Sequence, residues 1–288
     1  MQMNSNYKKF EALSTLKSSW TLYTENFGGV FLVSLIPIGV WLFFQILSFF
    51  TSGSNTLLNS ASNPEVLIKM LIKQITIGMM IYIFSFIINI LVNAGIINYF
   101  VNLVKEKKAP SPSTLLVFDM RILNFIIFNI LYIILSIVVT VITIIPFGIF
   151  ALFSGINKNQ LPIILSLSGI LILLLIMIFI AISVMFALSK YLIIDKHENA
   201  IHAFLKSFSF MRKNFLEMLL LLILLSIITI GVAISTLFIG LLFSTPFCYV
   251  VMANAYKMIA YPELESAQND DSQIEQIISS QEESEKDD

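Results

Sequence analysis

The sequence predicts an all-α protein, a polytopic transmembrane bundle of about six spanning helices with interfacial amphipathic helices between them. Three observations predict this class. Apolar residues make up 57% of the 288 residues and charged residues only 12%, whereas soluble domains carry about 25% charged residues. Long runs without any charge recur along the chain. Basic residues gather in alternate connecting segments. Lipid is therefore the expected solvent for most of the chain.

The charge-free runs set the expected spans. A helix needs about 20 apolar residues to cross a bilayer, and backbone groups in lipid must pair within their own segment, so these runs predict helices and not barrel strands. The last run, Met218–Tyr256, is too long for one span, and we expect a turn in it near Ser244-Thr245-Pro246. A single long tilted helix is the alternative. A transmembrane domain over residues 1–261 is predicted, with spans at about 28–50, 75–104, 122–150, 161–189, 215–241 and 245–260.

The distribution of basic residues predicts the orientation. Of the 17 Lys and Arg residues, 14 lie in one set of alternate connecting segments and 3 in the other. Because Lys and Arg stay on the cytoplasmic side of a membrane, both termini are expected to be cytoplasmic and the number of spans even. We therefore predict a multi-pass protein of the cytoplasmic (inner) membrane.

The chain has a basic part up to residue 261 and an acidic part after it. Residues 1–261 hold 16 basic and 8 acidic residues, and residues 262–288 hold 1 basic and 10 acidic residues. A basic membrane domain favours contact with anionic lipid headgroups. The acidic composition of residues 262–288 is typical of a disordered tail, which we expect to be cytoplasmic.

The segment before the first span has one apolar face. Its members are spaced alternately three and four positions apart, as on one side of a helix: Leu13, Leu16, Trp20, Tyr23 and Phe27. Aromatic residues on such a face favour headgroup depth. We therefore predict an interfacial helix at about 10–26.

This pattern returns at the same spacing late in the chain, in Ile201, Phe204, Phe208, Met211 and Phe215. The dipeptides Ser19-Trp20 and Asn26-Phe27 recur as Ser207-Phe208 and Asn214-Phe215. A weaker copy between them keeps Phe118 and Asn124-Phe125. The copies predict a threefold internal repeat of an interfacial helix followed by a two-helix hairpin, with further interfacial helices at about 111–120 and 198–213. Chance alignment of apolar-rich segments is the alternative.

One stretch also carries a family resemblance. The matching positions are Tyr191, Asp195, Ala200, Ser207, Phe208, Arg212, Lys213 and Phe215, with Pro246 and Tyr256 in the last helix. Over residues ~10–260 the chain resembles the YciC-like bacterial inner-membrane proteins, and it is similar to the membrane domain of some glycerophosphodiester phosphodiesterases. The resemblance implies a six-helix membrane protein without an established activity. The phosphodiesterase catalytic domain is not expected, since the segment that follows Tyr261 is far too short to form its barrel.

Two sets of residues are candidate contact sites. The basic interfacial helices predict contact with anionic lipid headgroups through Trp20, Lys206, Phe208, Arg212 and Lys213. Asn89, Asn93 and Asn129 lie in predicted spans, where they predict either a polar lining for a small solute or hydrogen bonds that join helices.

No residue set predicts catalysis. The charge-free runs contain no charged residue, and Asp119, Arg121 and Glu217 lie at their edges. His197 and His202 have the wrong spacing for a zinc motif, and Cys248 is the only cysteine. We therefore expect no catalytic, cofactor or metal site and no nucleic-acid partner. The expected function is non-enzymatic, in envelope or lipid organisation or as a scaffold for a membrane-protein partner. The alternative is a transporter or permease for a small neutral or apolar solute.

Overall fold

The computed structural model describes residues 10–51, 64–117, 119–153 and 161–261. The chain is helical in these ranges and forms no strand there, which confirms the predicted all-α class. The predicted acidic tail, 262–288, lies outside the described residues. The elements in chain order are α1 (Ala12–Glu25), α2 (Phe27–Thr51), α4 (Pro64–Glu106), the 3-10 turn η1 (Pro112–Leu115), α5 (Met120–Phe153), α6 (Leu161–Phe186), α7 (Ser189–Lys196), α8 (Ala200–Ser235) and α9 (Leu241–Ala260).

Five helical stretches of the described chain are long and apolar enough to cross a membrane. They are Phe27–Thr51, Ile72–Glu106, Met120–Ile142, Gly169–Lys196 and Ala200–Ser235. The sixth predicted span, 245–260, lies within α9, which is helical but is not one of these five. The protein is thus an all-α protein built around membrane-length helices.

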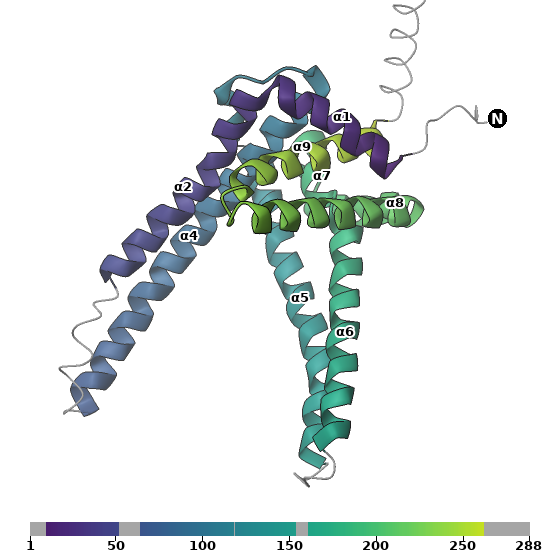
Figure 1. Ribbon diagram of the computed structural model, residues 1–288. Helices are drawn as coiled ribbons and strands as arrows, with labels where there is room; N and C mark the ends of the chain where they lie inside the picture. The colour runs from purple at the N-terminus through teal and green to yellow at the C-terminus, as the bar shows by residue number, and fades with distance from the viewer. Residues whose placement is uncertain (1–9, 52–63, 118, 154–160, 262–288) are drawn as a thin grey trace, which may run out of the picture.

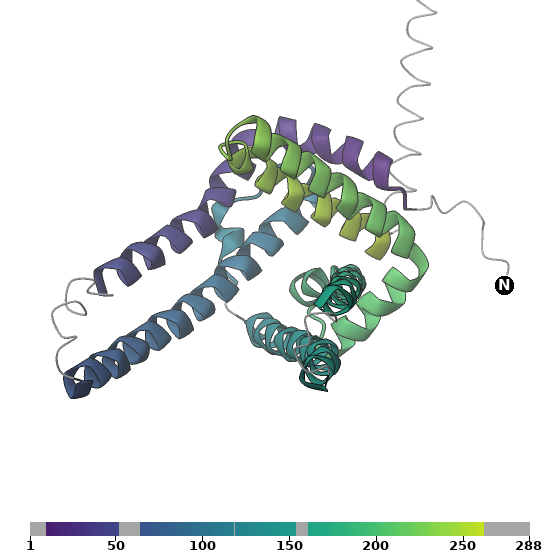
Figure 2. The same ribbon diagram turned by 60° about the horizontal axis from the view of Figure 1, so that its bottom comes forward.

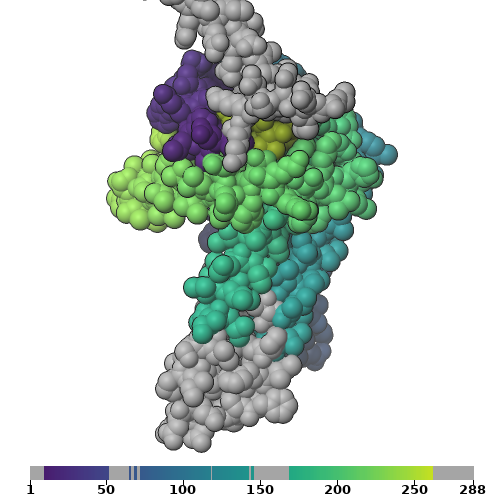
Figure 3. Space-filling view, turned by 90° about the vertical axis from the view of Figure 1, so that its right-hand side faces the viewer, coloured from purple at the N-terminus to yellow at the C-terminus, as the bar shows by residue number. Residues whose placement is uncertain are grey.

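Two long hairpins project from a head of transverse helices (Figure 1). One hairpin pairs α2 with α4, and the other pairs α5 with α6. The head consists of α1, α7, α8 and α9. When the molecule is turned, α5 and α6 are seen almost end-on while α8 still runs across the view (Figure 2). From the side, α8 forms a bar between α1 and the α5/α6 hairpin (Figure 3).

The predicted interfacial helix 198–213 and most of the predicted span 215–241 are the two helical segments of α8, which meet at a kink. Asn214 alone interrupts it, with φ −118° and ψ 18°. Asn199 caps its start by accepting a hydrogen bond from the Ile201 backbone N–H at 3.2 Å. The predicted boundary is therefore in the right place, and the chain bends there between two helical segments.

The turn after α8 lies earlier than predicted. Ser244, Thr245 and Pro246 belong to α9, and the helices are separated at residues 236–240, where Leu237 and Phe238 have positive φ of 50° and 69°. Pro246 lies in the second turn of α9, where its missing N–H leaves the carbonyl of Leu242 without its helical partner. Met218–Tyr256 is thus two helices, as predicted, with the turn misplaced.

The predicted interfacial helix 111–120 is a single 3-10 turn, Pro112–Leu115. Pro110 and Pro112 explain this, because proline lacks an N–H and disfavours helical geometry in the residue before it. The turn packs on α4 at Gly95, where an added Cβ would collide with the Leu115 carbonyl oxygen. A side-chain bond, from the Asn98 amide to the Thr114 carbonyl at 2.7 Å, fixes the same contact.

The core lies where the ends of α4, α7 and α9 meet. Tyr99, Tyr191 and Tyr256 are each buried there, one from each helix. The rings of Tyr191 and Tyr256 stack with centroids 5.4 Å apart. Where their side chains are described, the membrane-length stretches of the hairpins are exposed on most of their apolar surface, as expected for helices with lipid as solvent.

Candidate functional site

Helix α1 runs antiparallel to α9 along its whole length. Near the start of α1, the Thr15 hydroxyl lies 3.0 Å from the Met258 sulfur. In the middle, the Asn254 amide donates to the hydroxyls of Ser18 and Ser19, both at 2.9 Å. Towards its end, the ring of Tyr23 packs 5.6 Å from that of Phe247. These contacts hold α1 on the head.

Helix α1 is also tied to α8. The backbone N–H of Ala12, at the first turn of α1, donates to the Glu217 carboxylate at 3.1 Å. A carboxylate at a helix N-terminus satisfies an unpaired backbone donor and complements the helix dipole. Glu217 therefore has a structural partner, and α1 is anchored to both helices of the α8/α9 hairpin.

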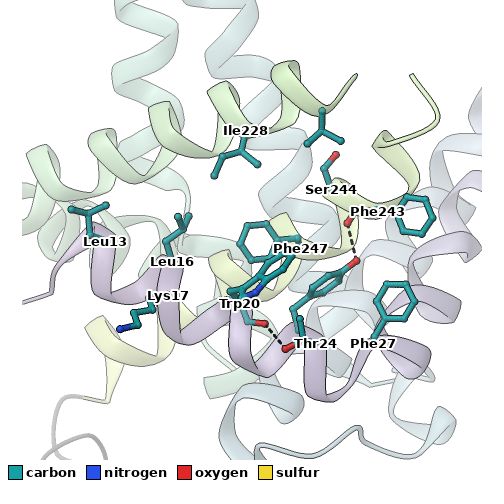
Figure 4. A pocket seen from close by; sticks show the side chains of 12 residues that line it. Leu13, Leu16, Lys17, Trp20, Thr24, Phe27, Ile228, Phe243, Ser244 and Phe247 are labelled. Atoms are coloured by element: carbon teal, nitrogen blue, oxygen red, sulfur yellow. Dashed lines mark hydrogen bonds between the residues drawn. The ribbon is translucent and has the colours of Figure 1, made fainter. Parts of the chain in front are cut away.

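A groove of about 890 Å³ lies between α1 and the α8/α9 hairpin (Figure 4). This volume is within the roughly 300–1,000 Å³ range of small-molecule sites. Helix α1 supplies one wall, α8 the opposite wall and α9 the base. The lining residues are Leu13, Leu16, Lys17, Trp20, Tyr23, Thr24, Phe27, Ile228, Val232, Phe243, Ser244 and Phe247.

Aromatic rings from two helices shape the groove. Trp20 meets Phe247 edge-to-face with centroids 5.6 Å apart, and Phe27 stacks with Phe243 at 6.2 Å. Trp20 and Phe27 remain partly open to the surroundings, whereas Phe247 is buried. The groove is therefore wide and apolar, with packed aromatic rings at its base. Such a groove is suited to a flexible hydrocarbon chain.

Two polar groups line this apolar surface without a partner in the described chain. Lys17 is exposed and forms no ion pair with any described residue. Ser244 is only 6% exposed, and its hydroxyl oxygen has no hydrogen-bond partner among the described residues. A buried polar group without a partner costs about 1–3 kcal/mol.

Tyr23 is satisfied within the protein. Its hydroxyl donates to the Phe243 carbonyl at 3.1 Å, and burial raises the pKa of the phenol above its ordinary value. The phenol therefore stays a neutral donor at physiological pH and links α1 to the first turn of α9. Of the groove's polar side chains, Thr24 also bonds to its own helix, at the Trp20 carbonyl.

A second polar cluster joins the ends of α4, α7 and α9. Asp195, buried on α7, pairs with Lys105 of α4 and accepts hydrogen bonds from Tyr256 at 2.7 Å and Tyr261 at 2.5 Å. Burial, and then the Asp195 carboxylate, raise the pKa of both phenols. Lys196 lies 4.1 Å above the Tyr261 ring. Because both carboxylate oxygens of Asp195 are engaged, this cluster fastens helices together and does not resemble an open ligand site.

The predicted headgroup contacts are not gathered in one place. Trp20 lines the groove, whereas Lys206 pairs with Glu198 at 2.5 Å. Phe208 is 44% exposed on α8. Arg212 and Lys213 are exposed beside the kink at Asn214 and have no ion pair within the described residues. Whether these side chains contact lipid remains a prediction.

The three candidate lining asparagines bond to their own helices. The amide nitrogens of Asn89, Asn93 and Asn129 each donate to the carbonyl one helical turn earlier, at 2.8, 2.7 and 2.7 Å. Among the described residues, no hydrogen bond joins Asn89 or Asn93 to Asn129. The amides are thus used locally, and the structure does not bring them into one polar lining or into an interhelical bond.

The apolar face predicted for residues 10–26 is found in the groove. All five of its members line it, so the periodicity identified one wall correctly. Sequence analysis missed the residues opposite, which are Ile228, Val232, Phe243, Ser244 and Phe247. They lie within uninterrupted apolar sequence, where nothing marks one residue as facing a groove and another as facing lipid.

Comparison with protein-family models, with curated proteins and with solved structures finds no match for this chain. The class therefore rests on the fold itself: an all-α protein with membrane-length helices. Within the described residues, no group of three or more His, Cys, Asp or Glu side chains could hold a metal ion. The most distinctive site of this helical membrane protein is the apolar groove beside α1.

Proposed function

We propose that the protein is a non-enzymatic, multi-pass protein of the cytoplasmic membrane that binds an anionic lipid in the groove between α1 and the α8/α9 hairpin. Its role is to organise lipid in the cytoplasmic leaflet, with the head as the lipid-binding part. The observation that carries the proposal is the apolar groove, whose lining includes the Lys17 side chain and Ser244, a residue whose hydroxyl has no partner among the described residues.

The shape and chemistry of the groove fit a phospholipid acyl chain. Its surface is almost wholly apolar and lined with aliphatic or aromatic side chains, and α8, which forms one wall, also carries exposed apolar residues. An apolar groove that opens towards lipid fills with hydrocarbon, because water there would lose its hydrogen bonds. The ester carbonyl of a lipid is an acceptor for a hydroxyl donor such as that of Ser244.

The charge of the groove favours an anionic headgroup. Trp20, one helical turn from Lys17, belongs to a residue type enriched at headgroup depth. A basic side chain near an anionic membrane surface contributes about 1 kcal/mol. Lys17 alone would therefore give about a fivefold preference for an anionic over a zwitterionic lipid.

Native mass spectrometry of the purified full chain with added lipid tests the proposal. Ile228→Trp fills the groove and should abolish retention of phosphatidylglycerol. Ile227→Trp is the matched control, since the neighbouring residue is 61% exposed and does not line the groove. Equal retention of lipid by both variants would refute the proposal.

The transporter alternative has weaker support. The asparagines expected to line a path use their amides within their own helices. Liposome flux of a small neutral solute that falls in Asn89→Leu and Asn93→Leu would favour transport over lipid binding.

A further inference from the structure

The third hairpin of the fold has an unexpected direction. Helices α8 and α9 follow the predicted repeat as a third pair, and the sequence predicts that they cross the membrane like the first two. In Figures 1 and 2 α8 instead runs across α5 and α6. The contacts of α9 determine how this hairpin is oriented relative to α1 and to the membrane.

Helix α9 must share the orientation of α1. The two helices are antiparallel neighbours from Thr15 and Met258 at one end to Tyr23 and Phe247 at the other. Between these ends, Asn254 bonds to Ser18 and Ser19. If one of the two helices lies along the membrane surface, the other lies there too.

Helix α1 is unsuited to crossing a bilayer. Its 14 residues span about 21 Å at 1.5 Å per residue, against a hydrocarbon thickness of about 30 Å. It also carries Lys17, Glu25 and several hydroxyl side chains. An amphipathic helix of this kind lies in the interface, and α9 therefore lies in the interface beside it.

The outer face of α8 fits the same placement. Exposed apolar residues follow each other beyond the kink at alternating spacings of four and three positions: Leu216, Leu220, Ile223, Ile227, Ile230 and Ile234. The opposite face is buried in the head through Met218, Leu221 and Leu225. Such a helix has protein on one side and hydrocarbon on the other, without needing to cross the bilayer.

The tip of this hairpin, residues 236–240, is apolar and largely exposed. Leu237, Phe238 and Ile239 are 83%, 69% and 64% exposed. Residues 236–240 contain no Lys or Arg, so the distribution of charge does not assign the tip to either side of the membrane. An apolar tip at the interface would anchor the head through its contact with that leaflet.

We propose that α8 beyond Asn214 and α9 form a hairpin that lies in the interface of one leaflet, with the Ile and Leu face of α8 resting on that leaflet. Only α2, α4, α5 and α6 then cross the membrane, which gives four spans and leaves both termini on the same side. The partner of the α8 face is the bilayer surface itself. This inference does not depend on which ligand occupies the groove.

Protease accessibility of the tip tests the inference. A short hydrophilic protease site is inserted between Leu237 and Phe238 in the full chain, and membranes are examined as sealed right-side-out and inside-out vesicles. Reference insertions are made at residues 107–108, beside the head, and within 52–63, between α2 and α4. The expected result is cleavage of the tip from the same side as the 107–108 reference.

Two cleavage results would contradict the inference. Cleavage from the side of the 52–63 reference, or cleavage only after detergent is added, would place the tip across or within the bilayer and overturn the inference. A second variant tests the same inference without an insertion, which could disturb the fold. Phe238→Cys in a Cys248→Ser background, where no other cysteine remains, should react with an impermeant maleimide from the 107–108 side only.

Discussion

Asn26 and Asn214 have nearly the same backbone conformation and the same side-chain hydrogen bond, although they lie 188 positions apart in the chain. Asn26 has φ −114° and ψ 20°, and Asn214 has φ −118° and ψ 18°. Each amide donates to the carbonyl one helical turn earlier, Leu22 at 3.1 Å and Phe210 at 3.0 Å. Both therefore end an amphipathic helix and redirect the chain into an apolar one.

This equivalence supports the repeat between the first and third units. Ser19 and Ser207, a further matched pair, are both fully buried. The partners of the asparagines differ, however, because the Asn26 side-chain oxygen also accepts from the Ala109 backbone N–H at 2.8 Å. The two asparagines thus have the same local role, but Asn26 makes one more hydrogen bond to a distant segment than Asn214 does.

We predict that Asn26→Ala destabilises the protein more than Asn214→Ala. The first substitution removes a helix-ending bond and leaves the Ala109 N–H without its acceptor, at about 1–3 kcal/mol. The second removes only the local bond, about 1 kcal/mol. Thermal unfolding midpoints in detergent check the order, and equal midpoints would contradict it.

Gly95→Ala should displace the segment around η1 from α4. Its Cβ would collide with the Leu115 carbonyl oxygen, and the clash should cost about 1–3 kcal/mol. Gly78→Ala is the control on the same helix, because no atom lies within 4 Å of its added Cβ. It should leave the unfolding midpoint unchanged or raise it, since alanine favours helix by up to about 1 kcal/mol.

Asp195→Asn should weaken the junction of α4, α7 and α9. The substitution removes the charge that pairs with Lys105 and accepts from two tyrosines, and hydrogen bonds to a charged group contribute about 1.5–3 kcal/mol each. Lys69→Gln breaks the exposed pair with Glu65 and should cost less than about 0.5 kcal/mol. If both variants unfold at the same temperature, Asp195 does not fasten the head.

The same cluster predicts a loss of stability at alkaline pH. Burial and the Asp195 carboxylate raise the pKa of Tyr256 and Tyr261 in the folded protein above the ordinary value of 10.0. The folded state therefore keeps protons that the unfolded state releases, so stability is retained below about pH 10 and falls as the pH rises further. Unfolding midpoints measured between neutral and strongly alkaline pH should fall less steeply in Tyr256→Phe.

The sequence was sufficient for the fold class, the position of most helices and one wall of the groove. Charge-free runs and the helical spacing of apolar residues both indicate that a segment is buried in an apolar medium. Neither distinguishes lipid from protein as the neighbour. The wall formed by Ile228 and Phe247, and the transverse direction of α8, depend on packing between segments from opposite ends of the chain, such as α1 and α9.

The most direct test of lipid binding uses Trp20 as the reporter. The chain has two tryptophans, and Trp41→Phe leaves only Trp20, in the groove. Vesicles of phosphatidylcholine are prepared with a low mole fraction of brominated phosphatidylglycerol or of brominated phosphatidylcholine. We expect the anionic quencher to reduce Trp20 fluorescence beyond its share of the lipid, and Lys17→Gln to remove the difference. Quenching that simply follows mole fraction for both lipids would contradict anionic-lipid binding in the groove.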